Sequence, residues 1–473
     1  MPARLSALDA SFLYLEQPTT PMHVGAVAIF RRPRSRQSDG GLAYETLTEL
    51  VEKRIALVPR YRQRVRHVPG NIARPVWIDD THFDIAYHVR RSALPRPGSD
   101  EQLTELVARL ASRPLDHERP LWEMYLIEGL ARNRVALMTK THQALVDGVG
   151  SIDILQVILD VTPEPRPFPE ELWMPRPEPS ATRLVLDALA EVVSRPGVAV
   201  ENARAALGDA IATTRRLVSG LGRLAVMAVT APRPAPGTPL NVGISTQRRC
   251  AFARTSLESF RRIRAAYGCS LSDVVLTVVA GALRNWLLLR GEAVTPSSRL
   301  RALVPLSMRG EDTSDGTTTS PPPDRMTTCL VDLPVGEPNP VVRLHQVRHA
   351  MREHTAGKAT VSPDTLVRLG GFAPPTLHAL GARAVSQFSR HIFNVVVTYV
   401  PGPQFPLYAA GARMLEIFPV VPLAPGQALT IGVTSYDGGL FFGFNGDREA
   451  MSDVEVLAGL VTETLDELLA TVG

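Results

Sequence analysis

The sequence contains little cysteine: Cys250, Cys269 and Cys329 are the three thiols in a chain of 473 residues. Their spacing matches no metal-binding pattern, and three thiols cannot build a disulfide framework. A secreted, disulfide-stapled fold is therefore excluded, and the reducing cytoplasm is the expected location. The opening residues MPARLSALDASFLYLEQ interleave polar and acidic side chains with apolar ones, so we expect no export signal there.

An excess of charge of one sign is also missing. Lysine and arginine number 51 against 47 aspartates and glutamates, and lysine occurs only at Lys53, Lys140 and Lys358. No Lys/Arg block of the kind that binds nucleic acid occurs. We therefore expect no nucleic-acid partner.

Long apolar runs are scarce as well. The stretches LRNWLLL and GRLAVMAV are much shorter than the roughly 20 residues that a membrane-spanning helix needs. Hydrophobic residues make up 45% of the chain and charged residues 21%, which is typical of a globular protein. Any contact with a membrane is therefore expected to be peripheral.

The sequence instead contains two α/β segments separated by a proline-bracketed region. Residues 1–161 alternate strand-like runs with amphipathic helices, of which 44–59 is an example. Residues 162–240 hold proline clusters around helical stretches, and residues 241–473 resume the α/β alternation. We predict an α/β protein of two domains joined by a long helical crossover.

The crossover helices carry apolar positions at helical spacing together with arginines. The apolar set includes Leu184, Leu186, Leu189, Val193, Ala206, Leu207, Ile211 and Leu217, and the arginines are Arg204, Arg215, Arg216 and Arg223. A basic amphipathic face can lie on an anionic membrane surface, whereas packing against the protein's own core is the commoner use of this pattern. Both interpretations stay open.

The second half contains recognisable local signals. It predicts a helix over 270–291, strands over 301–309, 327–334 and 394–400, and a hairpin whose two-residue turn is Asp437-Gly438. The last helix is expected to open with Ser452 and Glu455 as a capping box. Its predicted buried residues are Val456, Leu460, Leu465 and Leu469.

The stretch KTHQALVDGVG, residues 140–150, is the best candidate for chemistry. It follows two predicted strands, 120–130 and 134–142, so His142 stands at a strand end and a helix is expected after Gly150. An imidazole is suited to removing a proton from an attacking hydroxyl at neutral pH. Asp147 would fix the turn, and Gly148 would let a substrate approach the backbone closely.

Two competing interpretations concern histidines. A lone histidine at the end of an apolar strand can be a buried, hydrogen-bonded structural residue, so His142 has a purely structural alternative. His345, His349 and His354 share one predicted helix, but they lack the carboxylates expected of a catalytic metal centre. We predict that these three lie on the surface and that the protein has no metal site.

Several collinear segments resemble the bacterial wax ester synthase and acyl-CoA:diacylglycerol acyltransferase family, within the chloramphenicol acetyltransferase-like superfamily. They are LSALDASFLYLEQPTTPMHVGAVAIF, PLDHERPLWEMYLIEGL with the family's Pro-Leu-Trp, HQALVDG where the family has HHxxxDG, LSDVVLTVVAGALRNWLL, RALVPLSMR and NVVVTYVPGP. The resemblance implies two chloramphenicol acetyltransferase-like α/β domains with the active site between them. It also implies transfer of a fatty acyl group from acyl-CoA to diacylglycerol or a long-chain alcohol, without a cofactor.

This chain departs from the family at the position that matters most. The family's general base is the second histidine of HHxxxDG, which here is Gln143, and an amide has no usable basicity. Ser272-Asp273, Thr398-Tyr399 and Asp324-Arg325 also replace the family's usual pairs. The resemblance therefore identifies a divergent member.

The resemblance and the residues together give the predicted site. His142 would accept the proton, directly or through a water, Gln143 would donate a hydrogen bond, and Asp147 would hold the turn. Gly148, Asn394, Thr398, Pro401 and Gly402 would shape the substrate passage. We predict triacylglycerol synthesis from acyl-CoA and diacylglycerol, with long-chain alcohols as further acceptors, on a membrane surface or lipid droplet.

Two other functions stay open at this point. A catalytically silent lipid- or acyl-CoA-binding paralogue would keep the passage without the base. An acyltransferase of the same fold could instead act on a specialised acceptor such as a polyketide or a sugar lipid.

Overall fold

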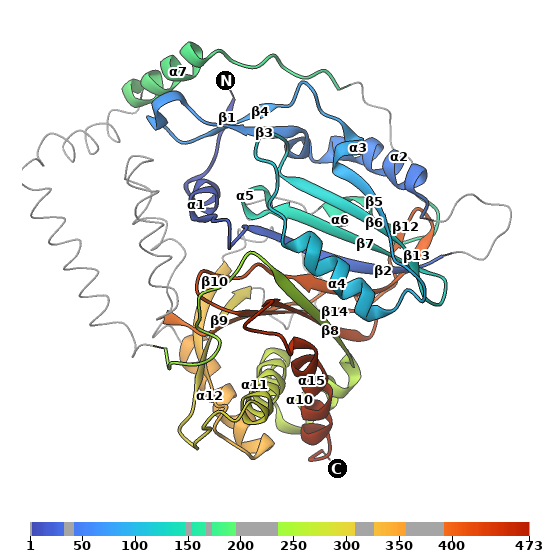
Figure 1. Ribbon diagram of the computed structural model, residues 1–473, viewed down its shortest axis with the longest axis vertical. Helices are drawn as coiled ribbons and strands as arrows, with labels where there is room; N and C mark the ends of the chain where they lie inside the picture. Colours follow the sequence, from blue (N-terminus) through green and yellow to red (C-terminus); the bar gives the residue numbers. More distant parts are fainter. Residues whose placement is uncertain are drawn as a thin grey trace, which may run out of the picture.

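The computed structural model describes residues 2–32, 42–146, 154–166, 173–194, 235–307, 326–355 and 392–472. Two six-stranded sheets form the centre of the molecule, one in each half of Figure 1. The first has the order β12-β13-β2-β7-β6-β5, and the second has the order β10-β9-β11-β14-β15-β8. The predicted α/β class with two sheet-and-helix units is confirmed.

The strands of the first sheet are β2 His23–Arg31, β5 Val89–Ala93, β6 Trp122–Leu130, β7 Arg134–His142, β12 Tyr408–Ala409 and β13 Ala412–Val420. Those of the second are β8 Arg248–Ser256, β9 Leu300–Ser307, β10 Met326–Leu333, β11 Val395–Val400, β14 Leu429–Tyr436 and β15 Gly439–Asp447. A third, three-stranded sheet contains β1 Ala3–Arg4, β3 Gln63–Arg66 and β4 Val76–Asp79. The helices are α1 Ala7–Leu15, α2 Tyr44–Arg54, α3 Ile85–His88, α4 Asp100–Ala111, α5 Gln143–Val146, α6 Ile154–Ile158, α7 Ala181–Ser194, α10 Leu257–Tyr267, α11 Leu271–Leu289, α12 Pro340–Thr355 and α15 Val454–Leu469.

The second half contributes two strands to the sheet of the first half, which the sequence did not predict. β13 comes from the second half, yet it pairs antiparallel with β2, and β12 extends the same sheet. Phe252 of β8 stacks on Phe418 of β13 with ring centroids 4.2 Å apart, and Arg254 pairs with Asp100 and Glu416 at 2.8 Å each. The predicted segment 241–473 therefore contributes to both sheets, and the halves form one packed body.

α11 corrects the prediction that every apolar run is too short to span a membrane. Its 19 residues, Leu271–Leu289, are long and apolar enough by composition to do so. However, 72% of its most apolar window is buried inside the protein, against strands of the second sheet. α11 is therefore a core helix, as Figure 1 shows among the helices below that sheet.

Local turn chemistry is confirmed at the hairpin and wrong at the last helix. Asp437 and Gly438 take φ values of 43° and 83° between β14 and β15, as a two-residue hairpin turn requires. α15 instead begins after Asp453 without a side-chain cap. Glu455 pairs with Arg249 at 2.8 Å. Of the residues predicted to be buried in α15, Leu460 and Leu465 are buried, whereas Val456 is exposed and Leu469 is half-buried.

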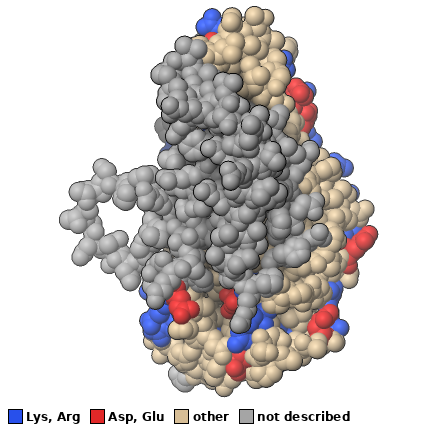
Figure 2. All heavy atoms as spheres, turned by 90° about the vertical axis from the view of Figure 1, so that its left-hand side faces the viewer, with Lys and Arg blue, Asp and Glu red and all other residues tan. Residues whose placement is uncertain are grey.

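Only part of the predicted crossover lies within the described residues. α7 runs along the top of Figure 1 and packs Leu184 and Ala188 against Val68, Val76 and Ile78. Its Leu186 and Leu189 stay exposed. The four crossover arginines from Arg204 to Arg223 lie outside the described residues. On the face in Figure 2, basic and acidic side chains of the described residues lie interspersed, without a large patch of one sign.

Candidate active site

His142 is the last residue of β7 and lies at the middle of the first sheet, opposite His23 of β2. Its side chain has no exposed surface. Because α5 begins at the next residue, the chain turns back and the Ala144 N–H donates to Nδ1 of His142 at 3.0 Å. A backbone amide only donates, so Nδ1 must offer a lone pair and the neutral ring carries its proton on Nε2.

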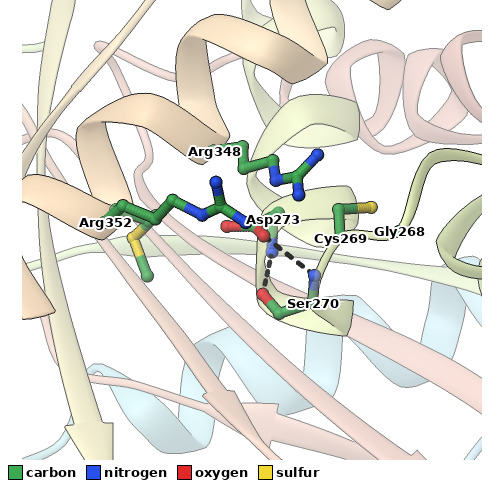
Figure 3. A pocket seen from close by; sticks show the side chains of 7 residues that line it. Gly268, Cys269, Ser270, Asp273, Arg348 and Arg352 are labelled. Carbon is green, nitrogen blue, oxygen red and sulfur yellow. Dashed lines mark hydrogen bonds between the residues drawn. The ribbon is translucent and has the colours of Figure 1, made fainter.

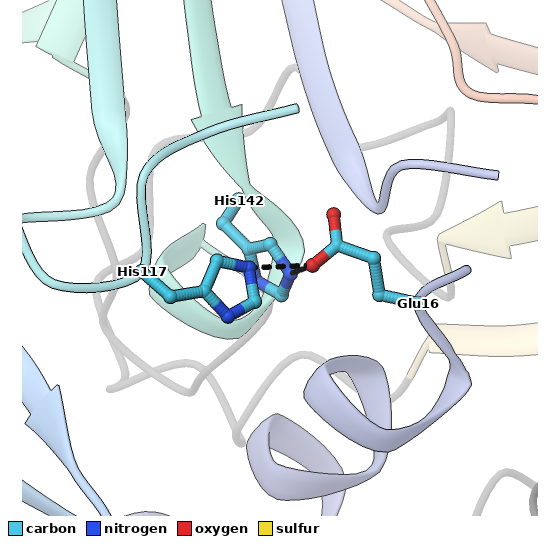
Figure 4. A group of neighbouring side chains, drawn as sticks. All are labelled: Glu16, His117 and His142. Carbon is cyan, nitrogen blue, oxygen red and sulfur yellow. Dashed lines mark ion pairs between the residues drawn. The ribbon is translucent and has the colours of Figure 1, made fainter. Parts of the chain in front are cut away.

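Glu16 faces that Nε2 atom. It follows α1 directly, and its Oε2 lies 3.5 Å from Nε2 of His142 and 2.6 Å from Nε2 of His117. Its Oε1 accepts the Met22 N–H at 3.0 Å, which fixes the carboxylate's orientation. Figure 4 shows the two imidazoles on the same side of the carboxylate, and their rings meet edge to face at 5.8 Å. We call Glu16, His117 and His142 the Glu-His-His cluster.

The Glu16 carboxylate carries the negative charge of the cluster and lies beside two imidazoles. Burial alone would raise the pKa of Glu16, but the hydrogen bonds and charges of His117 and His142 lower it well below its ordinary value. In turn, the hydrogen bond to Glu16 raises the pKa of His117. Burial lowers the pKa of the neighbouring His23 to about 3, so His23 is neutral at physiological pH. Glu16 is therefore an anion over the whole working range.

The Glu-His-His cluster has the side chains of a metal site, since its three possible ligand atoms lie within 4.8 Å of one another. Metal binding needs the lone pair of each imidazole nitrogen that faces the ion. The Ala144 N–H occupies the Nδ1 lone pair of His142, so its Nε2 is protonated and offers none. The arrangement therefore favours imidazole N–H groups that face the Glu16 carboxylate over a metal centre.

The remaining residues of the motif are only partly described. Gln143 opens α5 half-buried, and its backbone N–H donates to the Met22 carbonyl at 2.9 Å. Asp147 and Gly148 lie outside the described residues. The buried Nε2 of His142 faces Glu16 Oε2 at 3.5 Å, a longer contact than the 2.6 Å between His117 and the same oxygen. The predicted proton transfer to His142 stays a prediction, and in this arrangement its Nε2 is a donor.

The predicted substrate residues of the second half lie on or beside β11, in the other sheet. Asn394 is buried, and its amide accepts from the Arg301 N–H at 2.7 Å and donates to the Pro236 carbonyl at 2.8 Å. These bonds join the end of the crossover to β9, which gives Asn394 a structural role. The predicted contact of Thr398, Pro401 and Gly402 with a substrate stays a prediction.

Those three residues follow one another near the end of β11. Thr398 is half-buried opposite Gly432 of β14, and Pro401 is exposed. Gly402 donates its N–H to Ser435 Oγ at 3.2 Å, and a Cβ at Gly402 would lie 2.3 Å from the Ser435 carbonyl oxygen. Close backbone packing therefore requires glycine at this position, whatever passes beside it.

Two signature segments of the resemblance also have structural explanations. Trp122 is buried in β6 and donates its indole N–H to the Tyr61 carbonyl at 2.8 Å, and Leu121 is buried beside it, so both are core residues. Asp273 accepts the Ser270 N–H at 2.8 Å in the capping box that opens α11. Asp273 also faces a surface pocket with two arginines of α12 (Figure 3). The pocket is lined by Gly268, Cys269, Ser270, Asp273, Arg348, Met351 and Arg352.

The predicted surface position of His345 and His349 on α12 is confirmed, because both are exposed. His354 lies in α12, but its side chain is outside the described set. Sequence reasoning missed Glu16 and His117, which stand 101 residues apart and share no spacing pattern. The available signal was their position inside LYLEQP and PLDHERP, two segments that carry the resemblance.

Two family models match the chain. The wax ester synthase/diacylglycerol acyltransferase catalytic domain matches residues 5–275, and the C-terminal domain of the same family matches residues 324–469. A probable diacylglycerol O-acyltransferase of Mycobacterium tuberculosis is 52% identical over 270 residues, which are 57% of this chain and 98% of that protein. A putative diacylglycerol O-acyltransferase of the same species is 33% identical over 99% of this chain and all of its own length.

Solved structures agree with these matches. The wax ester synthase/diacylglycerol acyltransferase from Marinobacter aquaeolei VT8 covers 100% of both chains with 27% identity and a TM-score of 0.70. A starter condensation domain of rhizomide synthetase, solved with C8-CoA and Leu-SNAC, covers 99% of this chain with 14% identity and a TM-score of 0.54. The second likeness concerns the fold alone.

Proposed function

Because the chain belongs to the wax ester synthase/diacylglycerol acyltransferase family, we propose that it is an enzyme that transfers a fatty acyl group from acyl-CoA to diacylglycerol. The product is triacylglycerol. The observation that carries this function is the match over nearly the whole chain to diacylglycerol O-acyltransferases, together with the shared fold of the Marinobacter enzyme. The acyl thioester is already activated, so the reaction takes place without a metal or redox cofactor.

The chemistry needs a proton acceptor beside the attacking hydroxyl and a donor beside the thioester oxygen. The amide of Gln143 can donate a hydrogen bond to that oxygen but cannot take the proton. Asp147 and Gly148 keep their proposed roles in the turn that follows. Long-chain alcohols present the same hydroxyl chemistry, so wax ester formation is a side capacity of the same site.

A peripheral membrane contact is part of the proposal, since diacylglycerol and the ester product partition into lipid. Leu186 and Leu189 of α7 are 57% and 53% exposed, and Met174 before the helix is 83% exposed. Two leucines at i and i+3 share one face of a helix, and such a face can enter the interfacial layer of a membrane or lipid droplet. The proposed location is the cytoplasmic face of that surface.

The test is turnover with defined substrates. Purified protein is incubated with palmitoyl-CoA and either diacylglycerol or hexadecanol in mixed micelles, and free CoA thiol and the neutral lipid product are both measured. Acyl transfer predicts equal amounts of CoA and triacylglycerol above the rate without protein. Tight acyl-CoA binding without CoA release would identify the silent paralogue, and CoA release only with other acceptors would identify a specialised acyltransferase.

A further inference from the structure

Acyl transfer needs a proton acceptor, and the side chain at the usual position is an amide. His117 differs from His142 in two respects that bear on this need. Its side chain is 41% exposed, whereas that of His142 is fully buried. Its Nε2 lies 2.6 Å from Glu16 Oε2, so the neutral ring donates from Nε2 and keeps the lone pair on Nδ1.

The second nitrogen of His117 is free to act. Within the described part of the chain, no hydrogen bond involves Nδ1 of His117, and Figure 4 shows this atom on the side of the ring away from Glu16. A carboxylate that holds one imidazole nitrogen and leaves the other open is the arrangement of an oriented base. The charge that develops on the ring during proton transfer is then stabilised by Glu16.

We propose that His117, oriented by Glu16, is the general base of acyl transfer in this protein and replaces the basic side chain that position 143 lacks. The inference rests on the proposed function, since it assigns a residue to that reaction. His142 is then a positioning residue: its Nε2–H points at Glu16 and its Nδ1 is fixed by the Ala144 amide. Its ring packs edge to face against that of His117.

The proposed step balances without a co-reactant. As the acceptor's oxygen attacks the thioester carbonyl carbon, its O–H bond breaks and the proton moves to Nδ1 of His117. The C–S bond then breaks, and the imidazolium returns the proton to the departing sulfur as free CoA thiol. The products are an ester and CoA, and the base is regenerated.

The charges around His117 set the pH at which it works. Glu16 raises the pKa of His117, as do Asp116 and Glu118 of its own loop, while burial acts in the opposite direction. His142 of β7 packs against the ring. His67, beyond β3, lies near it as well, since burial first and the charge of His117 second lower the pKa of His67. Only the neutral ring accepts a proton, so activity rises with pH through this raised pKa.

The experiment compares kcat and its pH profile in His117→Ala, His117→Gln and Glu16→Gln with the wild-type enzyme. We expect both His117 variants to lose about 10²- to 10⁴-fold in kcat, the usual contribution of a general base. Glu16→Gln lowers kcat and moves the acid limb of the profile to lower pH, because the pKa of His117 falls. Imidazole added to the buffer restores part of the turnover of His117→Ala but none of that of His117→Gln, whose side chain fills the space.

A matched control exists on α12, where His349 pairs with Glu353 at 3.5 Å on the exposed surface. His349→Ala should keep wild-type kcat and pH profile. Wild-type kcat in folded His117→Ala, checked by thermal melting, overturns the inference while leaving acyl transfer intact. An inactive wild-type enzyme instead overturns the proposed function, and the base assignment with it.

Discussion

The buried ion pair between Glu123 and Lys140 allows a quantitative test of how β7 is held. The Lys140 side chain is 1% exposed, and its Nζ donates to Glu123 Oε2 at 3.1 Å and to the Arg113 carbonyl at 2.6 Å. Glu123 has two further partners, since Tyr125 donates to Oε2 at 2.8 Å and Arg90 lies 3.2 Å from Oε1. Lys140 therefore depends on Glu123 for compensation of its charge more than Glu123 depends on Lys140.

This inequality predicts which substitution is the more harmful. Glu123→Gln leaves the Lys140 ammonium buried with carbonyl oxygens alone, and an unpaired buried charge costs about 3–5 kcal/mol of unfolding free energy. Lys140→Met leaves Glu123 with Arg90 and Tyr125, so only one charged hydrogen bond is lost, roughly 1.5–3 kcal/mol. The double variant Glu123→Gln with Lys140→Met should lose less unfolding free energy than the two single variants lose together, because it no longer contains the buried ammonium.

The pH dependence supplies a second check on the same pair. Burial lowers the pKa of Lys140 below its ordinary value of 10.5, and loss of Glu123 lowers it further. When the pKa of a basic group is lower in the folded than in the unfolded state, the folded state gains stability as the pH rises from the folded pKa to the unfolded pKa. The loss of unfolding free energy in Glu123→Gln, relative to wild type, should therefore be smaller at alkaline pH. Urea unfolding at pH 7 and pH 9.5 measures both effects, and a larger loss for Lys140→Met than for Glu123→Gln would refute the reasoning.

Three further predictions concern the site and the membrane. Glu16→Gln should cost about 1.5–3 kcal/mol of unfolding free energy. The loss should be greatest between pH 4.5 and pH 6.5, the ordinary pKa values of Glu16 and His117. Below this window the stabilising contribution of the lowered Glu16 pKa decreases, and above it that of the raised His117 pKa decreases. Thermal melts across pH measure this, and a flat difference contradicts it. Gln143→His should raise kcat less than about 10-fold, since a base is already present, and a gain of 10² or more would mean that none is. Leu186→Ser with Leu189→Ser should weaken sedimentation with anionic vesicles, whereas Leu288→Ser with Leu289→Ser, at residues that are 45% and 68% exposed, should not.

The elements that the sequence predicted well are those specified by local patterns. β6, β7, β9 and β11 match their predicted ranges closely because each is a short apolar run bounded by turn residues. The Asp437-Gly438 turn follows from the same kind of local chemistry. The start of α15 was missed because Ser452 and Glu455 satisfy the capping spacing, but Glu455 is engaged by Arg249 of β8. A tertiary contact decided what the local pattern left open.

The place of β12 and β13 in the first sheet was beyond sequence reasoning for a different reason. β12 has only two residues, and no residue of β12 or β13 indicates from the sequence which sheet these strands join. Their place is decided by the free edge of β2 and by the stacking of Phe418 on Phe252. Pairing partners of a strand depend on shape and on long-range contacts, which a single sequence does not display.

The candidate site shows the same division between local and long-range information. The HQALVDG segment placed His142 at a strand end, but the tautomer of its neutral ring depends on the Ala144 amide, and thus on the turn that starts α5. Glu16 reaches the cluster from the end of α1 and His117 from the loop before β6, so three distant chain segments meet in the folded structure. A motif read in isolation makes His142 the base because it is the remaining histidine. The folded neighbours reverse that order: the buried ring is fixed as a donor, and the half-exposed ring beside it keeps the lone pair that the reaction needs.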